Sequence, residues 1–102
     1  MRLQLGNQWA DIPEMPDDFS WDTEDGYINV YQRNEGGART NRGVEVMGYI
    51  FRHSPNDLYR TYLSRLNCSG CAKILETTNL QEAIDLLATR VMLGGADYSE
   101  LP

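Results

Sequence analysis

The chain has 102 residues, two of them cysteines, and a formal net charge of −6 at pH 7. Such a chain can bury a core as one domain without metals or disulfides, and its 41% hydrophobic and 10% aromatic residues argue against global disorder. It contains no apolar run of the roughly 18 residues that span a membrane. Its first residues lack the apolar stretch of a signal peptide, so we expect a cytoplasmic protein with no membrane contact.

The charges are unevenly distributed along the chain. Residues 1–32 hold seven acids and one base, residues 33–73 hold seven bases and three acids, and residues 74–102 hold five acids and one base. Either the basic middle pairs with the acidic ends inside the fold, or the two kinds of charge form separate faces for partners.

The N-terminal quarter of the chain begins with a strand pattern and continues into an acidic stretch. Leu3 and Leu5 alternate with polar residues, which is typical of a short strand. Residues 11–25 hold two prolines and seven carboxylates, a composition that opposes regular structure. We therefore predict an irregular acidic segment over 11–25, docked on the domain through its apolar side chains. Those side chains are Ile12, Met15, Phe19 and Trp21.

Two later stretches are rich in β-branched and aromatic residues and predict strands over 27–32 and 44–52. Gly48 indicates a bulge or a close backbone approach. Apolar side chains fall on both faces of the second strand: Val44, Val46 and Ile50 on one, and Met47, Tyr49 and Phe51 on the other. Because one helix cannot cover both faces, a helix over 54–66 or a second chain must cover the other, and a homodimer is one way to do so.

The stretch 55–66 supports two interpretations. Ser54 and Pro55 resemble a helix start, and the apolar residues that follow have helical spacing. Tyr59, Thr61 and Tyr62, in contrast, prefer strands. We keep a strand and a second helix as alternatives here, and predict a last strand over 71–77.

Residues 79–93 carry the clearest pattern in the chain, the apolar stripe of an amphipathic helix. Thr78 or Asn79 is its predicted N-cap, and Gly94 is predicted to end it. The stripe consists of Leu80, Ala83, Ile84, Leu87, Ala88 and Val91. The sequence therefore predicts a single α+β domain over 1–95, in which an antiparallel sheet of three to five strands has this C-terminal helix packed on one face. Residues 96–102 are predicted to form a flexible acidic tail.

Groups that could carry chemistry are few. Cys68 and Cys71 have the spacing of a metal knuckle, but no second such pair follows and His53 is the single histidine. We interpret them as two reduced cysteines at a turn, with a metal site across a dimer as the alternative. The sequence shows no phosphate-binding glycine loop and no catalytic constellation. We predict a protein that is not an enzyme and uses no cofactor or metal.

The acidic segment is the predicted partner-binding surface, because Trp21 could anchor in a pocket while carboxylates meet a basic partner. Its predicted contact residues are Asp17, Asp18, Trp21, Asp22, Glu24 and Asp25. Trp21 could instead belong to the core. The alternative function is nucleic-acid binding through the Arg/Gly-rich loop 33–43 and its surroundings. The residues for that function are Arg33, Arg39, Arg42 and Arg52.

In size, acidity and lack of catalytic groups, the chain resembles the small inhibitors that phages make against host defence or transcription machinery, anti-CRISPR proteins among them. The resemblance is to a class of proteins and rests on no motif. It implies a protein-interaction module whose partner has a basic surface and belongs to a nucleic-acid-binding complex.

Overall fold

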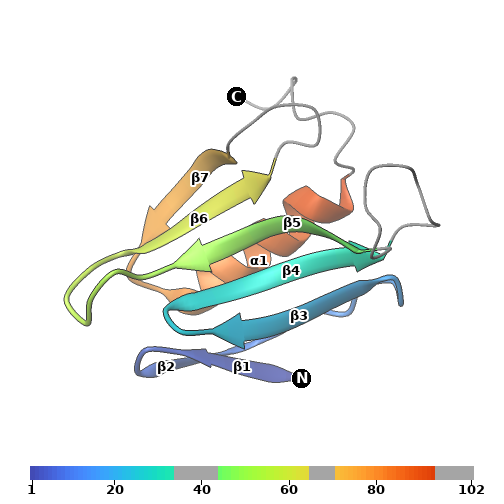
Figure 1. Ribbon diagram of the computed structural model, residues 1–102. Coiled ribbons are helices and arrows are strands. Elements are labelled where there is room, and N and C mark those ends of the chain that lie inside the picture. Colours follow the sequence, from blue (N-terminus) through green and yellow to red (C-terminus); the bar gives the residue numbers. More distant parts are fainter. Residues whose placement is uncertain (34–43, 65–70, 94–102) are drawn as a thin grey trace.

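The computed structural model describes residues 1–33, 44–64 and 71–93 (Figure 1). Within these ranges, seven strands precede one α-helix. The elements are β1 (Arg2–Leu5), β2 (Gln8–Asp11), β3 (Phe19–Glu24), β4 (Tyr27–Arg33), β5 (Val44–Phe51), β6 (Tyr59–Ser64), β7 (Cys71–Thr77) and α1 (Leu80–Met92).

The strands form two antiparallel sheets. Strands β3 to β7 lie side by side in chain order, and β1 and β2 form a separate hairpin. Helix α1 runs across one face of the five-stranded sheet, behind it in Figure 1. The predicted α+β class and the placement of the helix are confirmed.

The core lies between α1 and the face of the sheet that we call the inner face. All six residues of the predicted helix stripe are buried. The sheet and hairpin supply the other buried apolar side chains, which are Leu5, Ala10, Ile28, Val30, Met47, Ile50, Tyr59 and Leu63. Within the described ranges, the chain forms no helix that is long and apolar enough to cross a bilayer.

Helix α1 begins with a fully developed cap. Asn79 is the N-cap, and its side-chain oxygen accepts a hydrogen bond from the backbone N–H of Glu82 at 3.1 Å. The Thr77 hydroxyl donates to the Glu82 carboxylate and accepts from the Asn79 N–H at 3.1 Å. These bonds satisfy N–H groups that have no partner within the helix.

Two glutamines fasten the β1–β2 hairpin to the start of the helix. Gln8 donates to the carbonyl of Thr78 at 2.7 Å and accepts from the N–H of Leu80 at 2.9 Å. Gln81 accepts from the N–H of Asp11 at 2.7 Å and donates to the carbonyl of the same residue at 2.8 Å. These four hydrogen bonds therefore join β2 of the hairpin to the start of α1.

The stretch 55–66 contains a strand, so the alternative of a second helix is wrong. Tyr59, Thr61 and Leu63 are buried on the inner face, and the residues between them are only half-buried. This period of two overrides the helical spacing of the leucines, because β6 pairs with β5 on one side and β7 on the other. Within the described ranges, no second helix covers the outer face of β5.

The acidic segment is also more regular than expected. Residues 19–24 form β3, so an irregular path is correct only for the part between β2 and β3. Phe19 and Trp21 point inward while Ser20, Asp22 and Glu24 point outward. Carboxylates at the outward positions remain in water, and they therefore do not oppose strand formation. The predicted tail, 96–102, lies outside the described residues.

A bulge in β5 rearranges the faces predicted for this strand. Val30 pairs with Gly48 and Tyr31 with Val46, which leaves Met47 as an extra residue. Met47 consequently faces the core, where it is 2% exposed, although the sequence placed it with Tyr49 and Phe51. Val46 turns outward and is separated from Ile50, its predicted neighbour on one face. The bulge occurs next to Gly48, as that glycine indicated.

Replacement of Gly48 by alanine tests the approach of the helix to β5. A Cβ atom at this position would lie 2.6 Å from the carbonyl oxygen of Tyr62 and 2.7 Å from Cδ1 of Leu87. We expect Gly48→Ala to lower the free energy of unfolding by about 1–3 kcal/mol, measured by urea denaturation. A glycine-to-alanine change without such a clash would instead stabilise the fold by about 0.4–1 kcal/mol. Ser20→Ala on exposed β3 is the control, and a Gly48→Ala variant as stable as this control would contradict the close packing.

Candidate binding surfaces

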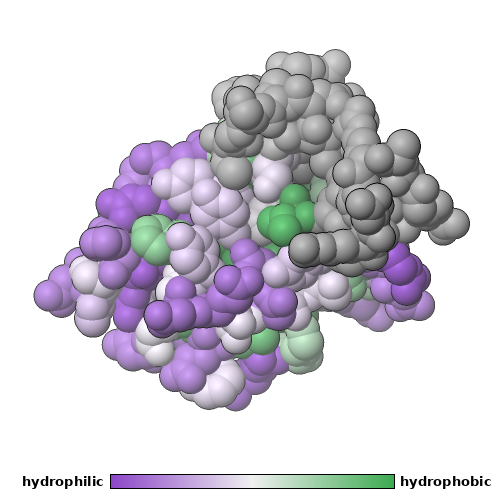
Figure 2. All heavy atoms as spheres, viewed as in Figure 1, coloured by the Kyte–Doolittle hydropathy of each residue, from purple (hydrophilic) through white to green (hydrophobic). Residues whose placement is uncertain are grey.

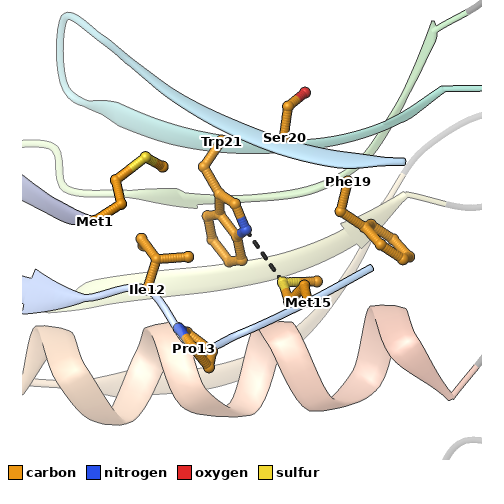
Figure 3. A pocket seen from close by; sticks show the side chains of 7 residues that line it. All are labelled: Met1, Ile12, Pro13, Met15, Phe19, Ser20 and Trp21. Atoms are coloured by element: carbon orange, nitrogen blue, oxygen red, sulfur yellow. Dashed lines mark hydrogen bonds between the residues drawn. The ribbon is translucent and has the colours of Figure 1, made fainter. Parts of the chain in front are cut away.

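Strand β3 divides the acidic segment between the two sides of the sheet. Trp21 and Phe19 point from β3 toward the segment that follows β2 (Figure 3). The indole Nε1 of Trp21 donates a hydrogen bond to Sδ of Met15 at 3.2 Å, and both side chains pack against the core. The predicted anchor, Trp21, therefore points away from the face that presents Asp22 and Glu24.

The predicted contact carboxylates gather around one edge of the sheet, and we call them the acidic patch. Its members are Asp17, Asp18, Asp22, Glu24 and Asp25. All are exposed except Asp18, which is half-buried and accepts a hydrogen bond from Nε2 of Gln32 at 2.8 Å. Asp22 accepts one from Nδ2 of Asn29 at 3.3 Å.

The five carboxylates of the acidic patch have no cationic partner among the residues that the structure describes, and the same holds for Glu14, Glu82 and Asp85. The salt bridges between described residues involve Asp11, Asp57 and Glu76. Arg2 pairs with the first, and Arg60 and Lys73 pair with the other two. The described part of the fold thus leaves the charge of the acidic patch without a counterion.

An apolar pocket of about 340 Å³ opens between the inner side of β3 and the segment that follows β2 (Figure 3). Its lining residues are Met1, Ile12, Pro13, Met15, Phe19, Ser20 and Trp21. The exposed Glu14 lies between two of these residues in the chain. The acidic segment therefore combines an apolar hollow with carboxylates on its exposed side.

The outer face of the sheet carries a row of aromatic rings, which we call the aromatic row. The ring centroids of Tyr27 and Phe51 are 4.7 Å apart, those of Tyr27 and Tyr49 are 5.8 Å apart, and those of Tyr49 and Tyr62 are 4.9 Å apart. The row crosses β4, β5 and β6, and all four side chains are half-buried. Figure 2 views the molecule from this side and shows pale and green side chains among purple ones.

The two ends of the aromatic row differ in charge. Tyr27 pairs in register with Glu24 of β3, at the acidic patch. At the other end, Tyr62 pairs with Lys73, which donates to Glu76 at 2.8 Å. Arg60 bridges Glu76 at 3.3 Å and Asp57 at 2.7 Å. This network lowers the pKa of Asp57, mainly through the bond from Arg60, and that of Glu76, mainly through the bond from Lys73. The end of the aromatic row at β3 is therefore negatively charged, whereas at the β6–β7 end the positive and negative charges offset each other.

The pKa of Tyr31 in β4 responds to the charge of the acidic patch. Burial raises the pKa of its phenol, and the nearby carboxylates of Asp22 and Glu24 raise it further. A negative charge near a phenol opposes formation of the phenolate. We expect Asp22→Asn to lower the pKa of Tyr31 toward its ordinary value, with burial keeping it from falling all the way.

The titration can be followed by NMR on protein with ¹³C-labelled tyrosine, with Tyr31→Phe to assign the signal among the six tyrosines. Glu14→Gln removes an exposed charge outside the acidic patch and should leave the pKa of Tyr31 unchanged. An equal pKa in the Asp22→Asn variant would place Asp22 too far away to act on the aromatic face.

Arg52 has a structural role that the nucleic-acid alternative did not foresee. Its guanidinium lies over the ring of Tyr59, 5.0 Å from the centroid, and Nη1 donates to the Tyr59 hydroxyl at 3.2 Å. The Tyr59 hydroxyl in turn donates to the carbonyl of Leu5 at 2.8 Å. The same guanidinium occupies the space where Gly6, with φ at +65°, would carry a Cβ atom. Arg52 therefore packs between the turn of the β1–β2 hairpin, at Gly6, and Tyr59 of β6.

Among the other arginines of that alternative, the structure describes the placement of Arg33. Arg33 is exposed at the end of β4. Arg39 and Arg42 lie outside the described residues, as does Cys68 of the cysteine pair. Among the residues with a described placement, the structure forms no group of three or more His, Cys, Asp or Glu side chains able to hold a metal ion.

Replacement of Arg52 tests its structural role. We expect Arg52→Ala to lower the free energy of unfolding by about 1–2 kcal/mol, because it removes a partly desolvated cation–π contact and a hydrogen bond. Thermal denaturation followed by circular dichroism measures the change. Arg33→Ala removes the same charge from an exposed site and should change the stability by less than about 0.5 kcal/mol. Equal stability of the two variants would show that Arg52 does not hold the hairpin.

Comparison with known proteins gives no match: no protein-family model, no curated protein sequence and no solved structure matches this chain.

Proposed function

We propose that this chain is a non-enzymatic protein-interaction module that binds a basic surface of a partner protein through its acidic patch. The observation that supports this most is that five carboxylates cluster along β3 with no cationic partner among the described residues. Arg2, Arg60 and Lys73 neutralise carboxylates elsewhere, whereas the acidic patch has no cation from the described part of the chain. A basic partner would supply the missing counterions.

The geometry of β3 favours recognition of an extended basic surface. Asp22 and Glu24 point to the same side of a strand, and their separation is therefore about 6.7 Å along the chain. Asp17, Asp18 and Asp25 add charge at the two ends of the same strand. Such a field accelerates encounter with a positively charged partner and suppresses wrong ones.

The specific form that we propose is an inhibitor or adaptor acting on a nucleic-acid-binding complex. Carboxylates spaced along a strand present a series of negative charges, as the phosphates of a nucleic acid do. A protein groove lined with lysine and arginine would accept either. The apolar pocket on the inner side of β3, which is the side opposite Asp22 and Glu24, gives the partner a separate place for one apolar side chain.

The test is affinity capture from a bacterial lysate, with and without nuclease, followed by mass spectrometry. We expect a stoichiometric protein partner that survives nuclease treatment. Asp17→Lys combined with Asp22→Lys should abolish its capture, because the reversals replace attraction by repulsion. Circular dichroism confirms that the variant remains folded.

The matched control places the same gain of charge on other exposed positions, through Gln4→Lys, Asn7→Lys and Asp85→Lys. This control should capture the partner as the unmodified chain does. Undiminished capture by the Asp17→Lys, Asp22→Lys variant would refute the acidic patch as the contact surface. Recovery of nucleic acid, or loss of partners on nuclease treatment, would favour the alternative based on Arg33, Arg39 and Arg42.

A further inference from the structure

We propose that the aromatic row and the carboxylates of Asp22 and Glu24 beside it form one site for an arginine-bearing extended segment of the partner. This inference rests on the proposed function and names the chemistry that the site selects. Under this proposal, the partner contacts the outer face of the sheet as well as the carboxylates of the acidic segment.

In the described part of the chain, the packed elements lie on the inner side of the sheet. Helix α1 and the β1–β2 hairpin both pack on the inner side, where Leu5 and Ala10 join the core. Among the described elements, none lies over the outer face (Figure 1). Four half-buried aromatic side chains in mutual contact on such a face form a surface that a ligand can stack on.

A guanidinium group matches this combination of rings and carboxylates. It is planar and weakly hydrated, so it stacks on an aromatic face while its N–H groups reach a neighbouring carboxylate. The molecule already contains this arrangement on the hairpin. Arg2 lies over the indole of Trp9, 5.2 Å from the ring centroid, and its Nε lies 3.6 Å from a carboxylate oxygen of Asp11. Tyr27 and Glu24 offer a similar pair of groups on adjacent strands.

The charges of the outer face favour this occupant over a second copy of the chain. A second copy would need a positive edge to meet Asp22 and Glu24. The β6–β7 edge does not provide one, because Arg60 and Lys73 are matched by Asp57 and Glu76. A nucleic-acid strand stacked on the row would bring its phosphates toward the same two carboxylates, and is disfavoured for that reason.

The experiment is an NMR titration of the full ¹⁵N-labelled chain with three capped heptapeptides. One carries two arginines separated by a serine, and the others carry two lysines or two glutamates at the same positions. We expect chemical-shift changes at the amides of Tyr27, Phe51 and Tyr62. The arginine peptide should bind about 3–10-fold more tightly than the lysine peptide, and the glutamate peptide should not bind.

Two variants distinguish the contribution of ring stacking to peptide binding from the contribution of the carboxylates. Tyr27→Thr should remove the preference for arginine over lysine and leave weak binding of both, because the carboxylates remain. Asp22→Asn combined with Glu24→Gln should weaken both peptides to a similar degree. Trp9→Thr is the control, since Trp9 is an aromatic residue, 54% exposed, outside the row. The spectra themselves report whether each variant is folded.

Several results would overturn the inference. Equal affinity for arginine and lysine peptides, with shifts confined to the acidic patch, would refute the aromatic site while leaving the proposed function standing. Absence of shifts with every peptide would refute it as well, and the capture experiment then decides the proposed function separately. Shifts of the row caused by a single-stranded oligothymidylate, or by self-association seen in sedimentation, would assign the face to nucleic acid or to a second copy.

Discussion

Leu87 of helix α1 rests on β5 at the one position of that strand that has no side chain, Gly48. The contact sets the distance between helix and sheet, because any larger residue would meet the helix or the backbone of β6. It allows the rest of the apolar stripe to reach the inner face, where Ile28, Ile50 and Leu63 are fully buried or nearly so. The core therefore depends on a single close approach that burial of apolar surface then stabilises.

A single helix covers a single face, and this limits what the remaining surface can be. None of the described elements covers the outer face, and this face carries residues that tolerate both water and contact. Tyrosine meets this requirement, since its ring provides apolar area and its hydroxyl remains hydrated. The charges at the edges of the face are distributed unequally, balanced at β6–β7 and unbalanced at β3. The outer face is therefore an uneven surface, with the rings in the middle and the negative charge on one side.

Local patterns predicted the elements better than the surfaces. The helix was predicted to within one residue at each end, because its apolar stripe and its N-cap residue indicate the same starting point. The bulge in β5 was indicated by Gly48. Strand β3 was missed because prolines and carboxylates dominate the composition of its surroundings, while the alternation within it is short. The aromatic row could not be predicted, since it depends on which residue of β4 or β6 lies opposite Tyr49 and Phe51. The role of Arg52 depends on the docking of a hairpin more than forty residues earlier in the chain.

The order of the elements has a consequence for synthesis on the ribosome. Among the described elements, the strands precede the helix, so the inner face of the sheet is made before the element that covers it. Until about residue 92 has left the exit tunnel, the apolar side chains of β4, β5 and β6 face water or other chains. The hairpin made first cannot be fastened either, because Gln8 and Asp11 bind residues at the helix start. Folding of the sheet is thereby postponed until the helix has emerged, and aggregation competes with it throughout that interval.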